Sequence, residues 1–208
     1  MPIMQTIRAT ALITALFGMG SAMAEPSDHV GKIEKAKNEV TAMPSATDPA
    51  RPLTVGNPVY RNEMVKTGAL ARAQLRLEDE TSLVMGENAE VRLDEFVYDK
   101  DGSATINLVT GALRFVSSAN GHPGKLTIKT PVATIGIRGT DFWAGPIDGV
   151  YGVLLMTGKV EVSNSAGSVT LDTPRTGTLI TGADVAPGDA VSWPDDRRVR
   201  ALSKTDFE

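Results

Sequence analysis

The stretch TPVATIGIRGTDFW, Thr130 to Trp143, joins a strand pattern to a cluster of polar and aromatic residues. Its first part alternates branched apolar residues with small ones, which is typical of a β-strand. Its second part places six residues of unlike chemistry side by side: Arg138, Gly139, Thr140, Asp141, Phe142 and Trp143. The stretch therefore predicts either a chemical site or a turn that holds a β-fold together.

We interpret the polar cluster as a structural turn. Gly139 allows the chain to turn or another backbone to approach closely, and the Thr140 hydroxyl can bond to the local backbone. Arg138 and Asp141 are expected to pair across this turn, or Arg138 to bind carbonyl oxygens with its five donors. Phe142 would then help to anchor the strand that follows.

Two functional hypotheses for the same cluster stay open. In the first, Arg138 binds a carboxylate or phosphate beside a stacking Trp143, which makes Trp143 the candidate partner-binding residue. In the second, Arg138 and Asp141 serve a hydrolase. The sequence supplies no nucleophile elbow or phosphate-binding loop to support catalysis, and we predict no catalytic residues.

The composition is that of an ordinary globular protein with more acidic than basic residues. The chain has 208 residues, of which 41% are hydrophobic and 22% charged, with a net charge of −4. This length predicts one domain with appendages, and the acidic balance argues against a nucleic-acid partner. There is no cysteine, which excludes disulfides and thiolate sites. The histidines, His29 and His122, lack metal-ligand spacing, so no metal or cofactor is expected.

The first 24 residues are predicted to be a cleaved signal peptide. Arg8 precedes an apolar run, and Ala22-Met23-Ala24 has the small-residue pattern of a cleavage site. The run is shorter than the roughly 20 residues that a membrane span needs. Cleavage would leave 20 basic and 25 acidic residues, a net charge of −5. We expect a periplasmic protein with no stable membrane insertion.

Short apolar–polar alternations separated by turn residues predict an all-β fold. Examples are residues 73–77, 82–85, 90–93 and 150–156, whose spacing favours a two-layered twisted sandwich or a β-solenoid-like fold of short antiparallel strands. Thr-Gly recurs at Gly68, Gly111 and Gly158. The recurrence is explained equally well by solenoid coils and by ordinary turns.

The two ends of this region differ from its middle. Residues 32–40 have apolar side chains at helical spacing and predict a short amphipathic helix. Residues 193–208 are charge-dense, which predicts a terminal helix or a charged C-terminal tail. The β-domain is accordingly predicted to span residues 25–192.

Three passages together resemble the FecR-domain family, named after the periplasmic regulator of ferric citrate transport. Residues 53–68 resemble the family's opening motif, residues 73–85 its strand-turn-strand, and residues 132–142 its closing "V-R-G-T-x-F". The resemblance spans about residues 30–143. It implies strands instead of a helix at residues 30–33 and 39–42, and it makes Arg138 to Phe142 a family signature.

Two departures from the family pattern concern turns. The family's Gly-Asp becomes Asn62-Glu63, and its Asp-Gly-Ser becomes Asp79-Glu80-Thr81-Ser82. Because Glu80 stands where a tight turn often needs a positive φ, we expect a different turn type there.

The resemblance implies a free-standing periplasmic domain. Family members that regulate sigma factors carry an N-terminal cytoplasmic helical region and a transmembrane helix. In this sequence the predicted signal peptide stands in their place. We expect a non-enzymatic protein that binds an envelope protein partner in signalling or assembly, through an edge strand or a flat sheet. The alternative is a glycan or cell-wall binding module. Such a module needs a row of exposed aromatic side chains, for which the sequence offers only Trp143, Trp193 and three tyrosines.

Overall fold

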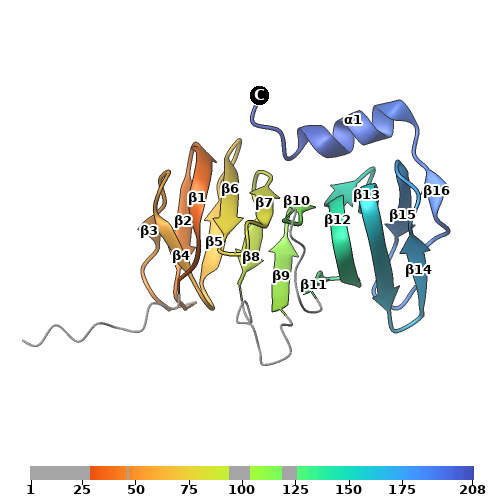
Figure 1. Ribbon diagram of the computed structural model, residues 1–208, viewed down its shortest axis with the longest axis horizontal. Coiled ribbons are helices and arrows are strands. Elements are labelled where there is room, and N and C mark those ends of the chain that lie inside the picture. Colours follow the sequence, from red (N-terminus) through yellow and green to blue (C-terminus); the bar gives the residue numbers. More distant parts are fainter. Residues whose placement is uncertain (1–28, 46, 94–103, 119–125) are drawn as a thin grey trace, which may run out of the picture.

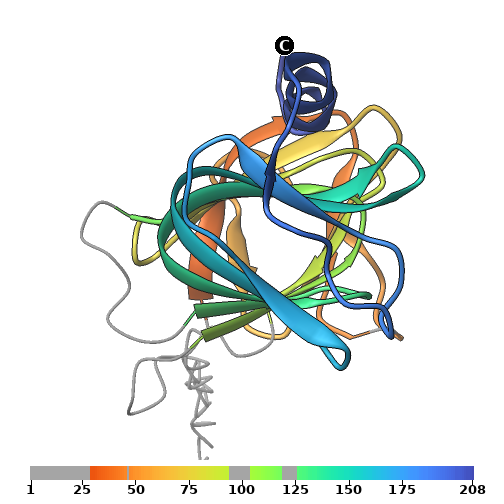
Figure 2. The same cartoon turned by 90° about the vertical axis from the view of Figure 1, so that its right-hand side faces the viewer.

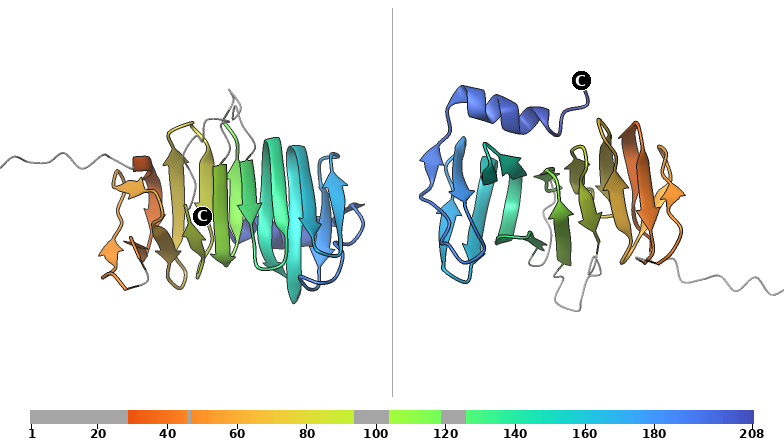
Figure 3. Two further views of the ribbon diagram at one scale, coloured as in Figure 1. Left: turned by 90° about the horizontal axis from the view of Figure 1, so that it is seen from below. Right: turned by 180° about the vertical axis from the view of Figure 1, so that it is seen from behind.

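The computed structural model describes residues 29–45, 47–93, 104–118 and 126–208. Strands are the main regular structure of this part of the chain, and they form one sheet of 16 strands that curls until its two halves face each other (Figures 1 and 2). The all-β prediction is confirmed. The arrangement has features of both expected forms. It has two facing layers, as in a sandwich, and its strands are stacked along one axis, as in a solenoid (Figure 3).

Half-sheet 1 forms one wall of the curled sheet. Its strands lie in the order β4, β1, β6, β7, β10. Their bounds are β1 (His29–Lys37), β4 (Pro58–Tyr60), β6 (Arg72–Leu77), β7 (Ser82–Met85) and β10 (Leu113–Val116). All four pairings between these neighbours are antiparallel.

Half-sheet 2 forms the opposite wall, with the order β3, β2, β5, β8, β9, β11. Its strands are β2 (Val40–Met43), β3 (Arg51–Pro52), β5 (Met64–Thr67), β8 (Glu90–Arg92), β9 (Ala104–Thr110) and β11 (Leu126–Lys129). The pair β9–β11 is parallel, which departs from the expected antiparallel pattern.

Two strands much longer than predicted connect the halves. The first part of β12 (Thr134–Ile147) pairs with β11, and its later part pairs with β10 in the other half. Strand β13 (Val150–Asn164) follows β12 along its length and then pairs with β14 (Gly167–Leu171) and β15 (Thr176–Ile180). Strand β16 (Val191–Ser192) adds to β15.

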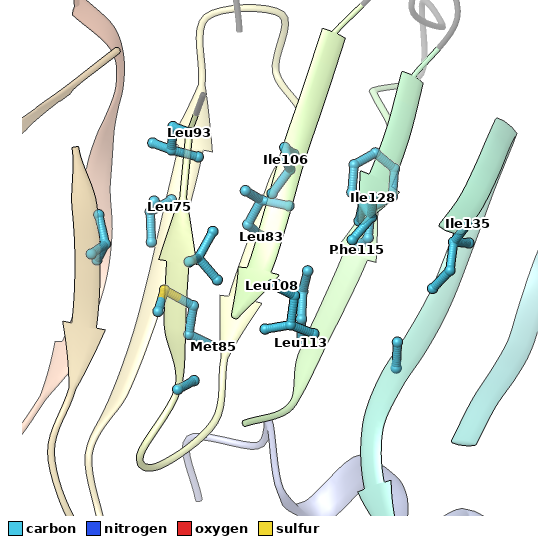
Figure 4. Close-up of a cluster of buried hydrophobic side chains, with 14 of the residues drawn as sticks. Leu75, Leu83, Met85, Leu93, Ile106, Leu108, Leu113, Phe115, Ile128 and Ile135 are labelled. Carbon is cyan, nitrogen blue, oxygen red and sulfur yellow. The ribbon is translucent and has the colours of Figure 1, made fainter. Parts of the chain in front are cut away.

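A single hydrophobic core lies between the half-sheets (Figure 4). Inward-facing residues alternate with outward ones along each strand, as a pleated strand buried on one face requires. Leu75 and Leu83 enter from half-sheet 1, and Ile106 and Leu108 from half-sheet 2; each is at most 1% exposed. Burying this apolar surface from both walls is what holds the two halves together.

The Thr-Gly recurrence coincides with passages between the halves. Gly68 lies between β5 and β6, and Gly111 between β9 and β10, so the chain changes halves at both. Gly158 lies inside β13, where its pairing with β12 shifts register. The recurrence therefore belongs to the stacked architecture.

The helix expected from the spacing of residues 32–40 is absent, because β1 and β2 occupy this segment. Ile33 and Val40 fill the core from two different strands. The spacing that suggested a helix arises because the register of β1 against β6 shifts between Ile33 and Lys35. The strands implied by the family resemblance are present.

The terminal helix is present as α1 (Asp195–Ser203), which lies outside the curled sheet (Figure 1). It packs on an outward-facing cluster formed by Trp143, Ile147, Leu154, Trp193 and Ala201 with Ala112. The segment after residue 193 therefore packs against the β-domain instead of extending as a free tail. The predicted signal peptide and His122 lie outside the described residues. Within those residues, no helix has the length and apolarity to cross a membrane.

Candidate functional site

The Arg138–Asp141 passage is the bend at which β12 passes from half-sheet 2 to half-sheet 1. Gly139 has a φ of 56°, and the register of β12 against β13 shifts between Arg138 and Asp141. Gly158, with a φ of 85°, lies opposite on β13, and a Cβ atom there would overlap the Gly139 carbonyl. The two long strands thus bend together because glycines face each other at the corner.

Thr140 fixes the bend through its hydroxyl and its backbone. Its side chain is 3% exposed and donates to the carbonyl oxygen of Lys159 at 2.9 Å. Its N–H donates to the Ser117 hydroxyl at 2.7 Å, and its carbonyl accepts from the Ser117 N–H at 2.9 Å. The threonine therefore bonds to residues of both neighbouring strands, and not to the local backbone that the sequence suggested.

Asp141 pairs with Arg114 on β10, so the expected pairing with Arg138 is wrong. Two bonds of 3.1 and 2.8 Å join the Arg114 guanidinium to both carboxylate oxygens. This hydrogen bonding raises the pKa of Arg114 above its ordinary value. The bend separates residues 138 and 141 into different half-sheets, which is why they do not meet.

Arg138 is exposed on the outer face of half-sheet 2, opposite Lys159 in the β12–β13 register. It therefore does not bury its guanidinium against carbonyl oxygens. Because Arg138 and Asp141 do not converge, the geometry brings no pair of groups together for the hydrolase hypothesis.

Trp143 faces away from the main core but is fully buried. Its neighbour Phe142 stacks on Phe115 in the main core at a centroid distance of 5.5 Å. Trp143 points to the opposite side of β12 and meets the edge of Trp193 at 6.4 Å. Both indoles are at most 1% exposed. A partner could reach Trp143 only if the C-terminal segment moved away.

The C-terminal segment is also tied to the sheet by charges. Asp148, at the tip of the β12–β13 hairpin, accepts from Arg197 and Arg200, each at 3.0 Å. These bonds lower the pKa of Asp148 below its ordinary value, and the bond from Arg200 has the larger effect. Farther on, Lys37 donates to the Phe207 carbonyl at 3.3 Å. The outer side of half-sheet 1 is thereby partly covered by the chain's own end.

The outer face of half-sheet 2 is different. No described helix packs on it. Five residues lie in register across five strands on this face, namely Thr105, Thr127, Gly136, Glu161 and Thr170. Beside this row lies a shallow hollow of about 480 Å³. Sequence reasoning named no residue of this face except Arg138, although the alternation of β9 and β11 assigns Thr105 and Thr127 to one side.

The described residues hold no group of three or more potential metal ligands from histidine, cysteine, aspartate and glutamate. His29 instead pairs with Glu78 at 2.9 Å on the surface.

Comparison with known proteins identifies a family match and two similar structures. The family model described as "FecR protein" matches residues 63–186. Two crystal structures of a "putative anti-sigma factor" from Parabacteroides distasonis, at 1.65 and 2.50 Å resolution, superpose with a TM-score of 0.56 at 16% identity. The superposition covers 67% of this chain and 64% and 63% of those chains, which is less than two thirds of their length. No curated protein matches the sequence.

The matched range contains the strand-turn-strand passage, the bend and both long strands. It begins at Glu63, inside the opening passage of the resemblance. Glu63 is itself structural: it is 3% exposed, accepts from Arg51 at 2.8 Å and from the Tyr60 N–H at 3.0 Å. The match covers more than half of the chain, and the chain belongs to the FecR family.

Proposed function

We propose that this protein acts in envelope signalling by binding a protein partner, without catalysing a reaction. Membership in the FecR family supports a regulatory role. The anti-sigma factor description of the similar structures points the same way, although at 16% identity that likeness establishes the fold alone. A periplasmic location rests on the predicted signal peptide and belongs to this proposal.

The observation that carries the proposal is the contrast between the two outer faces. Half-sheet 1 is partly covered by α1 and the residues that follow it. Half-sheet 2 presents a flat row of exposed and half-exposed side chains on consecutive strands. A flat face of this kind suits docking of another protein, because neighbouring strands present a broad surface.

Glycan binding is the weaker alternative. Sugar rings are commonly held on exposed aromatic side chains, which present a flat apolar surface with a polar edge. Trp143 and Trp193 are both buried against each other, so neither contributes to such a surface in this structure. We therefore retain protein binding as the proposed function.

The test is cross-linking in the intact envelope, followed by identification of the captured molecule. The proposal expects a defined protein to be recovered reproducibly with this chain. Recovery of cell-wall fragments without a protein would show that the signalling proposal is wrong and would favour the glycan alternative.

A further inference from the structure

We infer that the C-terminal segment, residues 193–208, is a displaceable latch over a binding site for a tryptophan-bearing segment of another protein. The site lies on the outer face of half-sheet 1, at a slot that the Trp193 indole now fills. The inference goes beyond the proposed function, because it concerns the opposite wall of the curled sheet. Three observations carry it: the shape of the slot, two indole N–H groups without an acceptor, and the limited contact that holds the latch in place.

Two glycines form the floor of the slot. Gly152 on β13 and Gly177 on β15 lie on the same outward side of neighbouring strands. A Cβ atom on Gly152 would lie 2.7 Å from the nearest ring atom of Trp193, and one on Gly177 would lie 2.5 Å from it. Trp143 on β12 forms a wall and meets the edge of Trp193 at a centroid distance of 6.4 Å. The indole therefore lies directly on strand backbone, which only glycines permit at this distance.

Both indole N–H groups of this cluster lack a hydrogen-bond partner while the latch is in place. The Nε1 atoms of Trp143 and Trp193 are buried, and no acceptor among the described residues lies within reach of either. A buried tryptophan usually finds a partner for its N–H, and an unpaired buried donor costs stability. A segment that brings an acceptor to the Trp143 N–H would therefore bind this site better than the chain's own end does.

Beyond the Trp193 ring, the contacts that hold the latch are mostly polar. Ala201 is the buried residue of α1, and Val199 is 66% exposed. No side chain caps the first turn of this helix. Arg197 and Arg200 pair with Asp148 at 3.0 Å, but partly exposed ion pairs stabilise little and are weakened by salt. Segments with few buried apolar contacts open locally at a small cost in free energy, so the latch can leave without unfolding the sheet.

The latch itself shows which chemistry the site accepts. Trp193 fills the slot, and the Arg197 guanidinium lies over its ring at 5.6 Å. Arg197 and Arg200 are three positions apart and lie on one face of the helix, from which both reach Asp148. The competing segment is therefore expected to carry a tryptophan followed by basic residues on one helical face. Its arrival would also bring Trp143 into contact with a partner.

The probe is a fluorescein-labelled peptide with the sequence of residues 191–208. The receptor is the full chain with Trp193→Ala, a change that empties the slot and retains Asp148. Binding is measured by fluorescence anisotropy. We expect this variant to bind the peptide at least about tenfold more tightly than the wild type, whose own latch competes at an effective concentration of roughly millimolar order.

Two matched controls test whether the slot is the site. Trp193→Ala combined with Gly152→Val should lose binding, because the added side chain occupies the slot. Trp193→Ala combined with Gly136→Val should retain it, because Gly136 lies on the opposite wall and the nearest atom to a Cβ there is 3.9 Å away. A peptide whose tryptophan is replaced by alanine should bind about tenfold more weakly or less, since a buried tryptophan commonly dominates an interface. Thermal unfolding of each variant shows whether it remains folded.

The wild type provides a second measurement that needs no variant. The chain has two tryptophans, and both lie in the cluster under the latch. Urea titration is followed by tryptophan fluorescence and, in parallel, by far-UV circular dichroism of the sheet. We expect the fluorescence midpoint at a lower urea concentration, because the latch opens before the sheet unfolds.

Coincident midpoints would overturn the latch. The site is overturned if Trp193→Ala does not bind the peptide, if the wild type binds it equally well, or if Gly152→Val leaves binding intact. A wild-type dimer that exchanges this segment, detected by sedimentation velocity, would overturn the assignment of the site to a different protein. Each of these results leaves the proposed function standing, because that function rests on the face of half-sheet 2.

Discussion

Gly139 and Gly158 face each other at the corner where the two longest strands bend, so closely that a Cβ atom on residue 158 would overlap the carbonyl of residue 139. This contact lets one pair of strands serve both half-sheets. It gives the signature passage of the family a structural explanation: the glycine and threonine in it shape and fix the corner.

Gly158→Ala should destabilise the protein strongly. The substitution imposes a side chain on a positive φ and also forces backbone apart at the corner. Gly149→Ala is the matched control, because Gly149 has a φ of 82° but open space around it. We expect about 1 kcal/mol for Gly149→Ala from backbone strain, and about 2 kcal/mol more for Gly158→Ala from the overlap. Urea unfolding measures both, and equal losses would refute the proposed role of the contact.

Thr140→Val should cost about 1–2 kcal/mol, because the isosteric change removes a buried donor and leaves the Lys159 carbonyl without that bond. Thr170→Val, on an exposed residue of edge strand β14, should stay within about 0.5 kcal/mol. Unfolding free energies from denaturant titration provide the comparison. A loss at residue 140 no greater than that at residue 170 would show that the hydroxyl does not hold the bend.

Glu80→Gly should stabilise the protein. Glu80 has a φ of 67°, a conformation that costs a non-glycine residue about 1 kcal/mol, and its side chain is 72% exposed. The expected gain is about 0.5 kcal/mol, because glycine loses more entropy on folding. Glu80→Ala removes the same carboxylate but retains the strain, so it should not stabilise. A thermal shift for alanine as large as that for glycine would contradict this explanation.

Acidification should loosen the C-terminal segment before the sheet unfolds. The pKa of Asp148 is lowered in the folded protein by Arg200 and Arg197. Its contribution to docking is therefore fully present above the ordinary aspartate pKa, near 3.9, and is lost as pH falls through the lowered value. Limited proteolysis near α1 should increase below about pH 4. Asp148→Asn should show this susceptibility at neutral pH already, and a variant as resistant as the wild type would exclude the Asp148 contacts as the cause.

The sequence was sufficient to predict an all-β fold, because alternation and turn residues depend on neighbours along the chain. The bonds of Thr140 were not predictable in the same way, because its hydroxyl donates to the carbonyl of Lys159, 19 positions later, and its N–H to Ser117, 23 positions earlier. The pairing of Arg138 with Asp141 failed because their separation depends on the bend. Asp141 instead meets Arg114, 27 positions earlier, a contact fixed by the register of β10 against β12.

The residues that surround Trp143 could not be predicted from its neighbours in the sequence either. Its alternation with Phe142 shows that the two rings point to opposite sides, but not what covers the outer one. Trp193 does so from 50 positions later in the chain. The turn at Glu80 differed from expectation for another reason. Glu80 replaces the family's glycine but still has a positive φ, at a cost in backbone strain, so the turn type did not change as expected.

The most direct measurement places a photo-cross-linking amino acid at Val109, on the outer face of half-sheet 2, and in a second variant at Val191, which is similarly exposed on β16. After illumination of intact envelopes, captured molecules are identified by mass spectrometry. We predict that one protein is captured at residue 109 and not at residue 191. Equal capture at both positions, or cell-wall fragments in place of a protein, would contradict it.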